Sequence, residues 1–189
     1  MKRDASKPLR LGVLLSGSGR TLQNVLAEID AGRLHAEVAV VIASRPCKGV
    51  ERARAAGLDA HVVPYKDSRD AGGYSAAIAA RLDAAHVDLV CLAGFLSFWE
   101  VPPHYAGRVM NIHPALLPSF GGAGMWGHHV HEAVLAAGCK VSGCTVHFVT
   151  NEYDAGPIIV QRCVPVAEGD DADALAARVF AQECQAYPE

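Results

Sequence analysis

The sequence alternates between apolar, strand-like runs and segments with helical spacing, and this alternation constrains the fold more than any other feature. The apolar runs LRLGVLLSG and AEVAVVIASRP are each followed by a helical segment, TLQNVLAEIDAGR and CKGVERARAAGL. Continuously apolar strands that alternate with helices are typical of a parallel sheet covered by helices on both faces. The sequence therefore predicts an α/β fold, doubly wound around a mostly parallel sheet.

The pattern changes towards the C-terminus. The apolar runs VDLVCLAGF and VMNIHPALLP still continue the alternation. The last two strand-like runs, VSGCTVHFVT and PIIVQRCVPV, are separated only by NEYDAG, which is too short for a crossover helix. We therefore expect an antiparallel C-terminal strand pair, followed by a final helix that begins at the acidic residues near 171.

The chain has 189 residues, of which 51% are hydrophobic, and this suits one globular domain. The sequence shows neither an internal repeat nor a linker, so we expect a single domain over 1–189 with a polar, loose tail at 1–8. The six cysteines form no C-x-x-C pair, and several lie in apolar runs. Buried reduced thiols explain them best.

The charge of the chain bears on its partners. The formal net charge is -3, from 17 basic and 20 acidic residues that are interspersed along the sequence. This balance offers no broad electrostatic footprint for nucleic acid or an anionic membrane, so small-molecule substrates are favoured. No signal-peptide pattern opens the chain, and no apolar run approaches the roughly 20 residues that span a bilayer. We expect a cytoplasmic protein, either a monomer or a homodimer.

The first glycine loop, Ser16 to Thr21, lies between an expected strand and an expected helix. Backbone N–H groups and the helix dipole favour an anion there, so phosphate binding is one interpretation and a simple tight turn is the other. The loop lacks both the G-K-[ST] ending of a Walker loop and the third glycine of the dinucleotide motif. Ser44 and Arg45 end the second strand and keep an NADP-binding alternative open, because an arginine there can meet a 2'-phosphate.

The segment NIHP places Asn111 and His113 two residues apart in an expected strand, so both side chains point to one side of the sheet. An amide can donate a hydrogen bond to a developing oxyanion, and an imidazole can donate one or move a proton near neutral pH. Asp154 in NEYDAG is the best candidate to orient the imidazole, with turn propensity as the other reason for an aspartate there. These three residues would suit a tetrahedral intermediate.

Four residues around the next expected helix invite a metal interpretation, namely His128, His129, His131 and Glu132. We expect no metal, because H-E-x-x-H is absent, no cysteine pair supports a site, and a solvated helix start explains these residues. His147 alternates with apolar neighbours in TVHFV, as either a core residue or part of a site. The loop over 121–131, which contains Trp126, is either a lid over substrate or a surface connection.

Several segments in combination resemble the folate-dependent glycinamide ribonucleotide formyltransferases of purine biosynthesis, and the likeness covers nearly the whole chain. The segments are LLSGSGRTLQ, ERARAAG, VCLAGF, HYAGRVMNIHPALLPSF, SGCTVHFV, YDAGPIIVQ and AARVFAQE with YP. The resemblance implies the formyltransferase fold, with a Rossmann-like N-terminal half. It also implies formyl transfer from 10-formyltetrahydrofolate, as co-substrate, to the amine of glycinamide ribonucleotide.

The resemblance also implies the site residues. Asn111 and His113 would stabilise the oxyanion, while Asp154 would hold His113 and aid proton transfer. The half over about 9–108 would bind the ribonucleotide phosphate, and the half over about 109–189 would carry catalysis and folate binding. The residues expected at the ribonucleotide are Ser18, Gly19, Arg20, Thr21, Arg69 and Glu183. Those expected at the folate are Leu96, Ser97, Phe98, Trp99, Thr150, Asn151, Glu152 and Tyr153.

Three departures from the family pattern concern substrate affinity rather than the catalytic trio. Arg20-Thr21 replaces the usual Ser-Asn, Ser97 stands where an arginine is common, and FGGAGMWGHHVHE is longer than the usual loop. The alternatives are hydrolysis of the formyl donor, a non-catalytic nucleotide-binding module, and the NADP oxidoreductase. A formyltetrahydrofolate hydrolase adds an N-terminal regulatory domain and a methionyl-tRNA formyltransferase a C-terminal RNA-binding domain, and we expect neither here.

Overall fold

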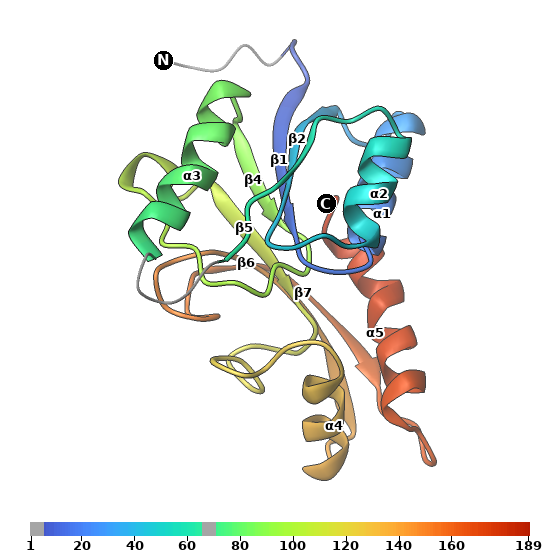
Figure 1. Ribbon diagram of the computed structural model, residues 1–189. Helices are drawn as coiled ribbons and strands as arrows, with labels where there is room; N and C mark the ends of the chain where they lie inside the picture. The colour runs from blue at the N-terminus through green and yellow to red at the C-terminus, as the bar shows by residue number, and fades with distance from the viewer. Residues whose placement is uncertain (1–5, 66–70) are drawn as a thin grey trace. The chain divides into compact units, whose positions relative to one another are not determined.

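Figure 1 shows the computed structural model of the chain, which describes residues 6–65 and 71–189. The chain divides into two compact units, Met1–Pro102 and Pro103–Glu189. Each unit has its own strands, helices and buried apolar residues. The expectation of a single domain stays a prediction.

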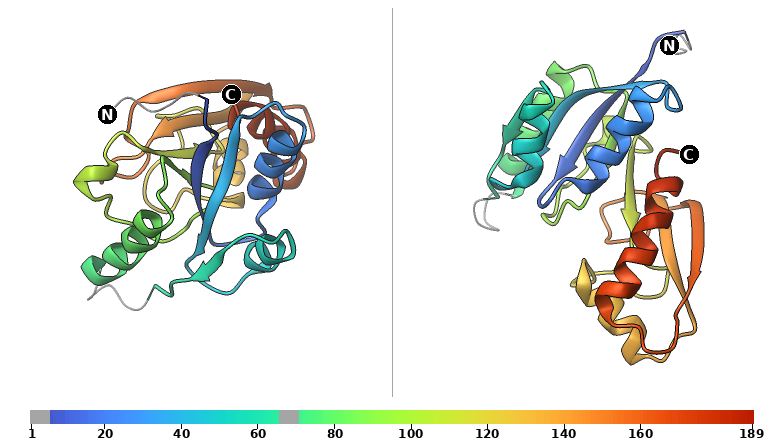
Figure 2. Two further views of the ribbon diagram at one scale, coloured as in Figure 1. Left: turned by 90° about the horizontal axis from the view of Figure 1, so that it is seen from above. Right: turned by 90° about the vertical axis from the view of Figure 1, so that its right-hand side faces the viewer.

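The first unit is a parallel sheet covered by helices. Its strands are β1 (Leu9–Leu15), β2 (Ala36–Ala43), β3 (Ala60–Val62) and β4 (Leu89–Leu92). They lie in the order β3-β2-β1-β4, and the pairs β1–β2, β1–β4 and β2–β3 are all parallel. Its helices are α1 (Arg20–Asp30), α2 (Lys48–Ala55) and α3 (Ala71–Ala84). Helices α1 and α2 cover one face of this sheet and α3 covers the other (Figures 1 and 2).

The core of the first unit follows from the apolar runs. Leu14, Leu15 and Ile42 are fully buried in the strands, and Ile78 and Leu82 are fully buried in α3. Gly12 leaves room for this packing, because a Cβ at Gly12 would lie 2.4 Å from a methyl carbon of Leu82. The doubly wound arrangement predicted from these runs is therefore present.

The second unit is antiparallel. Its strands are β5 (Val109–His113), β6 (Val141–Phe148) and β7 (Ile158–Pro165), in the order β5-β6-β7. Its helices are α4 (His128–Ala136) and α5 (Ala172–Ala186), with a 3-10 turn at Pro103–Tyr105. Helix α5 packs against β6 and β7. Its first turn is capped as predicted, since the Asp171 carboxylate accepts a hydrogen bond from the Ala174 N–H at 2.8 Å.

The predicted antiparallel strand pair, β6 with β7, is confirmed. The structure adds a second antiparallel pair that the sequence did not predict, because β5 also pairs antiparallel with β6. The reason is that the loop and short helix between them return the chain in the opposite direction. The strand is also shorter than the apolar run VMNIHPALLP, because it ends at His113, before Pro114.

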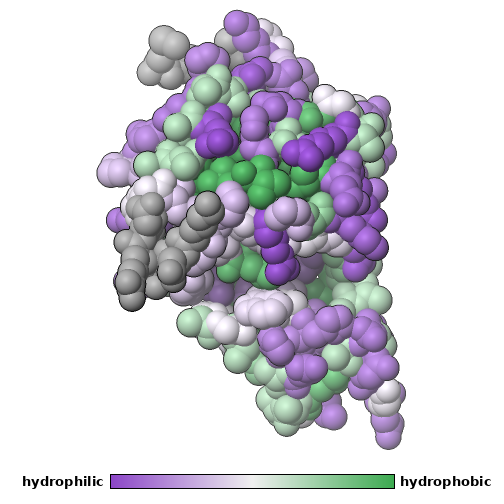
Figure 3. All heavy atoms as spheres, viewed as in Figure 1, coloured by the Kyte–Doolittle hydropathy of each residue, from purple (hydrophilic) through white to green (hydrophobic). Residues whose placement is uncertain are grey.

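The surface of the described residues includes both polar and apolar side chains. On the face seen in Figure 3, hydrophilic residues surround smaller groups of hydrophobic ones. Val141, Ile158 and Ile159 are among the exposed large hydrophobic residues. Within 6–65 and 71–189, no helix is both long and apolar enough to cross a membrane.

Candidate active site

The second unit brings together the three residues predicted to be catalytic. Asn111 and His113 project from the same side of β5, as their spacing requires. The register of the neighbouring strand sets Asn111 opposite His147 and His113 opposite Thr145. Asp154 comes from the connection between β6 and β7, and it meets His113 and His147 near the end of β5.

The chain that leaves β5 is held in place by buried hydrogen bonds. The Thr145 hydroxyl donates to the Ala115 carbonyl at 2.7 Å and accepts from the Leu117 N–H at 3.0 Å. The Gln161 amide donates to the Leu117 carbonyl at 2.9 Å and to the Thr145 hydroxyl at 3.0 Å. These bonds satisfy polar groups that the turn at Pro114 removes from the strand ladder, and they fix the end of β5.

The imidazole of His113 is buried, with 3% of the residue exposed. Its Nε2 lies 2.8 Å from the Phe120 carbonyl oxygen. A carbonyl only accepts hydrogen bonds, so Nε2 carries a proton in this arrangement. In the neutral ring Nδ1 is then unprotonated, and it faces the Asp154 carboxylate with a distance of 3.6 Å to Oδ2. That distance is longer than a hydrogen bond, and the contact is suited to a ring that gains a proton at Nδ1.

Asp154 is held in a strained turn. Its φ of 52° is in the left-handed region, which non-glycine residues rarely adopt. The Gly122 N–H donates to its Oδ2 at 2.9 Å. Gly156 is required just beyond it, because a Cβ there would lie 1.7 Å from the Phe148 carbonyl oxygen. Strain of this kind persists only where the surroundings hold it, and it is frequent at functional sites.

His147 belongs to this cluster, which answers the question that its alternating pattern left open. Its Nδ1 lies 2.9 Å from the Phe148 carbonyl oxygen and therefore carries a proton. In the neutral ring Nε2 is then the acceptor for the Asn111 Nδ2 group at 3.2 Å. The same nitrogen lies 3.5 Å from Asp154 Oδ1, where a proton on Nε2 would favour the charged carboxylate. The second N–H of the Asn111 amide thus points away from His147. The strand register, rather than any local motif, is the signal that identifies His147.

Burial and neighbouring charges act in opposite directions on the pKa of His113 and on the pKa of Asp154. Burial lowers the pKa of His113 below its ordinary value of 6.5, although Asp154 and the Phe120 carbonyl both favour the charged ring. Burial alone would raise the pKa of Asp154, but the His147 contact, the charge of His113 and the Gly122 N–H together lower it. Near neutral pH the cluster therefore contains a neutral imidazole beside a carboxylate.

This arrangement can stabilise a developing negative charge and accept a proton. The remaining Asn111 N–H is a fixed donor for an oxyanion, because His147 sets the orientation of the amide. The unprotonated Nδ1 of His113 can take up a proton, and the Asp154 carboxylate would stabilise the resulting cation. Such chemistry suits attack on a carbonyl group.

The predicted phosphate loop lies in the first unit. Ser18 and Gly19 form the turn after β1, and Arg20 and Thr21 begin α1. Gly19 is the N-cap residue with a φ of 74°, which a glycine adopts without strain. The first turn of α1 contains no acidic residue. Arg69, predicted for the ribonucleotide, is outside the described residues, and Glu183 lies partly exposed on α5 of the second unit.

The residues predicted for folate differ in exposure. Leu96 is 43% exposed, and its N–H donates to the Ser16 hydroxyl at 2.9 Å. Trp99 is buried, and its Nε1 donates to the Ser75 carbonyl at 3.3 Å, so its ring packs in the first unit. Ser97 and Phe98 are partly buried between them. In the second unit, Thr150, Asn151, Glu152 and Tyr153 are all exposed.

The histidines of α4 take part in side-chain pairs. His128 Nε2 lies 3.3 Å from Asp173 Oδ1, and His129 Nδ1 lies 3.4 Å from Glu132 Oε2. Trp126 is 49% exposed, and its ring and that of His129 form a T-shaped pair with centroids 4.9 Å apart. In the described part of the chain, no group of three or more His, Cys, Asp or Glu residues could hold a metal ion.

Comparisons with known proteins identify relatives of the chain. The family model for formyl transferase matches residues 9–189. The phosphoribosylglycinamide formyltransferase of Escherichia coli is 38% identical over 185 residues, which cover 95% of this chain and 84% of that protein. The trifunctional purine biosynthetic protein adenosine-3 of Drosophila melanogaster is 43% identical over 187 residues. This match covers 95% of the chain but only 13% of the trifunctional protein.

Solved structures extend the likeness to the fold. Glycinamide ribonucleotide transformylase 1 from Symbiobacterium toebii superposes with a TM-score of 0.86 at 45% identity, covering 96% of this chain and 84% of that one. The Brucella melitensis phosphoribosylglycinamide formyltransferase gives a TM-score of 0.87 at 38% identity, and the match covers 96% of this chain and 93% of that one. The resemblance predicted from the motifs and the predicted fold class are both confirmed. The chain belongs to the formyl transferase family.

Proposed function

We propose that the protein transfers the formyl group of 10-formyltetrahydrofolate to the amine of glycinamide ribonucleotide, as an enzyme of purine biosynthesis. The observation that carries this proposal is the cluster of Asn111, His113 and Asp154 at the end of β5, in a chain of the formyl transferase family. The relatives named for this reaction match the chain nearly from end to end. The cytoplasmic location and the choice between monomer and homodimer stay predictions.

The proposed reaction passes through a tetrahedral intermediate. The amine nitrogen of the ribonucleotide attacks the formyl carbon, and a C–N bond forms while the carbonyl oxygen gains negative charge. The Asn111 N–H that points away from His147 donates to this oxyanion. The bond from the formyl carbon to N10 of the folate then breaks, and the amine proton that is lost is balanced by a proton gained at N10.

His113 and Asp154 serve the proton transfers in this proposal. The unprotonated Nδ1 accepts a proton from the amine, directly or through water, and Asp154 stabilises the imidazolium that results. The Nε2–H of His113 donates to the Phe120 carbonyl. For His113 also to donate to the oxyanion, as predicted, this N–H must either be shared between the two oxygens or leave Phe120 when substrate binds. Phe120 has a left-handed φ of 57°, which is consistent with a strained contact at this point.

The substrate-binding residues are part of the same proposal. Ser18 to Thr21 receive the ribonucleotide phosphate, with Arg69 and Glu183 at its other groups. The folate lies against the backbone at 96–99 and 150–153. The support from the structure is that the loop leads directly into α1, whose first turn contains no acidic residue, which suits a helix start that binds an anion.

Consumption of the formyl donor with and without acceptor tests the proposal. We expect 10-formyltetrahydrofolate, or its dideaza analogue, to be consumed only when glycinamide ribonucleotide is present. Consumption without the ribonucleotide would identify a hydrolase, in which water replaces the amine. No consumption under either condition, together with ribonucleotide binding, would identify a non-catalytic module, and a bound nicotinamide would identify an oxidoreductase.

A further inference from the structure

The three carbonyl groups of the glycine loop each accept a hydrogen bond from a different donor on the chain around the start of α2. Arg45 Nε donates to the Ser16 carbonyl at 2.8 Å. The Gly49 N–H donates to the Gly17 carbonyl at 3.0 Å. Arg52 Nη1 donates to the Ser18 carbonyl at 2.5 Å. We call the segment 45–52 the carbonyl clamp.

The clamp determines which way the N–H groups of the loop point. The C=O of one residue and the N–H of the next belong to a single planar trans peptide, and they point in opposite directions. The carbonyls of Ser16, Gly17 and Ser18 face the clamp, so the N–H groups of Gly17, Ser18 and Gly19 face away from it. Three successive N–H groups directed to one side are the arrangement that binds a phosphate oxygen.

Two glycines, Gly19 and Gly49, allow the clamp to pack closely against the loop. A Cβ at Gly19 would lie 2.7 Å from the Gly49 Cα, and a Cβ at Gly49 would lie 2.6 Å from the Leu15 side chain. The Gly19 contact is with a backbone atom, which no rotamer change relieves, and a Cβ at Gly49 would also lie 3.1 Å from the Gly17 carbonyl oxygen. Close packing of the loop against the first turn of α2 therefore depends on glycine at both positions.

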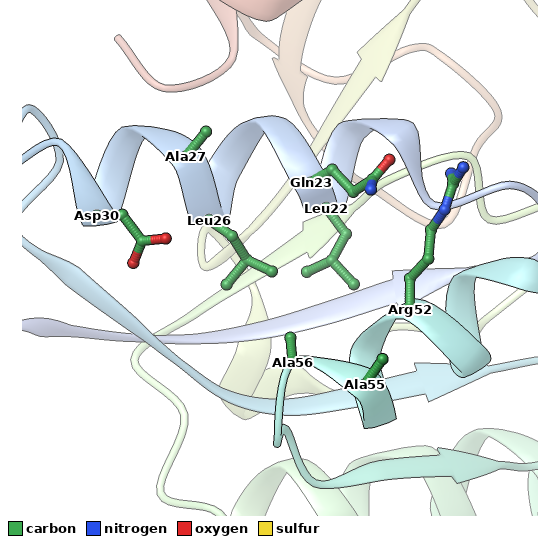
Figure 4. A pocket seen from close by; sticks show the side chains of 8 residues that line it. All are labelled: Leu22, Gln23, Leu26, Ala27, Asp30, Arg52, Ala55 and Ala56. Carbon is green, nitrogen blue, oxygen red and sulfur yellow. The ribbon is translucent and has the colours of Figure 1, made fainter.

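The clamp also carries charge. Arg45 and Arg52 supply two guanidinium groups to the side of the loop that faces α2, and the start of α1 adds its dipole. Figure 4 shows Arg52 extending from α2 alongside the first turn of α1. Behind it lies a groove of about 430 Å³ between α1 and α2, lined mainly by Leu22, Leu26, Ala27, Ala55 and Ala56. The guanidinium therefore lies at the end of this groove, beside the loop.

We propose that the carbonyl clamp positions the loop Ser16–Ser18 for the phosphate monoester of the ribonucleotide, with Arg45 and Arg52 as positioning residues. This inference rests on the proposed function. The two arginines act through the backbone of the loop, and they keep its carbonyl oxygens, which would repel a phosphate, turned towards α2. The effect is on ribonucleotide binding and leaves the chemistry at His113 unchanged.

Arg52→Ala tests the clamp, and Arg54→Ala is its matched control. Arg54 lies on the same helix with the same charge, but its guanidinium donates to the Ala60 carbonyl at 3.2 Å and does not contact the loop. For Arg52→Ala we expect a rise of about tenfold in KM and Kd for glycinamide ribonucleotide, because a charged hydrogen bond is lost. The kcat and the KM for the formyl folate stay within about twofold. Arg52→Lys, which keeps a charged donor, recovers part of the loss.

The readouts separate this inference from the proposed function. Titration calorimetry gives the ribonucleotide Kd without any turnover, and steady-state kinetics gives the division between KM and kcat. Equal ribonucleotide affinities for Arg52→Ala, Arg54→Ala and wild type would overturn the clamp, while leaving the proposed function intact. A wild-type chain that does not bind the ribonucleotide would overturn both. Arg45→Ala removes a different bond of the clamp, and we expect the same rise in KM and Kd for the ribonucleotide with kcat little changed.

Discussion

At the scale of single residues, the site depends on which nitrogen of each histidine carries its proton. The Phe148 and Phe120 carbonyls are acceptors only, so they fix the protons on His147 Nδ1 and His113 Nε2. His147 then orients the Asn111 amide, and His113 presents an unprotonated nitrogen to Asp154. Two backbone carbonyls therefore orient both the proposed oxyanion donor and the proposed proton acceptor.

His113→Ala should lower kcat by about 10²- to 10³-fold, the usual cost of losing one group that stabilises the transition state. The ribonucleotide Kd should change little, because the proposed phosphate loop belongs to the other unit. His129→Ala is the control, since His129 is an exposed histidine that pairs with Glu132 and packs against Trp126, away from β5 in sequence. Full activity in His113→Ala would contradict the assigned role. Circular dichroism would check that the variant folds.

Two buried histidines make stability depend on pH. Burial lowers the pKa of both His113 and His131 below 6.5, so the unfolded chain binds more protons than the folded one as pH falls through this value. Their contribution to stability is complete above about pH 6.5 and is lost as pH falls towards their folded pKa values. We expect the free energy of unfolding in urea to fall between pH 7.5 and 5.5, by at most about 1.4 kcal/mol per pH unit for each histidine.

The double variant His113→Gln with His131→Gln should show a flatter pH dependence than wild type over the same range. His129→Gln, in which an exposed histidine is replaced, should keep the wild-type slope. A wild-type stability that is constant or rises on acidification would contradict the account. Asp154 acts at lower pH, because its lowered pKa gives stability that is lost only below about 3.8.

At the scale of secondary-structure elements, β6 and the turn after it position the site. The sequence predicted the strands and helices, because continuous apolar runs and helical spacing reflect the buried faces directly. It did not predict that β5 and β6 are antiparallel neighbours, and therefore could not place His147 opposite Asn111. A histidine among alternating apolar residues has the same local pattern in a core and in a site.

Gly156→Ala should lower the free energy of unfolding by roughly 3 kcal/mol, because the new Cβ would meet the Phe148 carbonyl and push the Asp154 turn away from β6. Gly72→Ala on α3 is the control. Gly72 has open space around its Cβ position and no positive φ, so alanine should cause no loss and a gain of up to about 1 kcal/mol. Urea denaturation of both variants provides the comparison, and equal stabilities would refute the strained-turn account.

At the scale of the whole molecule, the residues proposed for function divide between the two units. The proposed phosphate loop and its clamp belong to Met1–Pro102, and the proposed catalytic cluster belongs to Pro103–Glu189. The residues alone indicated an anion site at the glycine loop and, at NIHP, side chains that suit attack on a carbonyl group. Both could be predicted because each depends on a short stretch of sequence. The pairing of Asp154 with His113 came from the resemblance, because local sequence favours a turn aspartate equally. The clamp was not predicted, since its contacts run from side chains to backbone carbonyls and leave no motif.

The fate of an isotope-labelled formyl group tests the central claim most directly. The purified chain would be incubated with labelled 10-formyltetrahydrofolate and glycinamide ribonucleotide, and the products resolved by mass spectrometry. We predict that the label appears in the ribonucleotide as a formamide, with tetrahydrofolate formed in equal amount. Label recovered as free formate, with the ribonucleotide unchanged, would contradict the proposal that this chain is a formyltransferase for that amine.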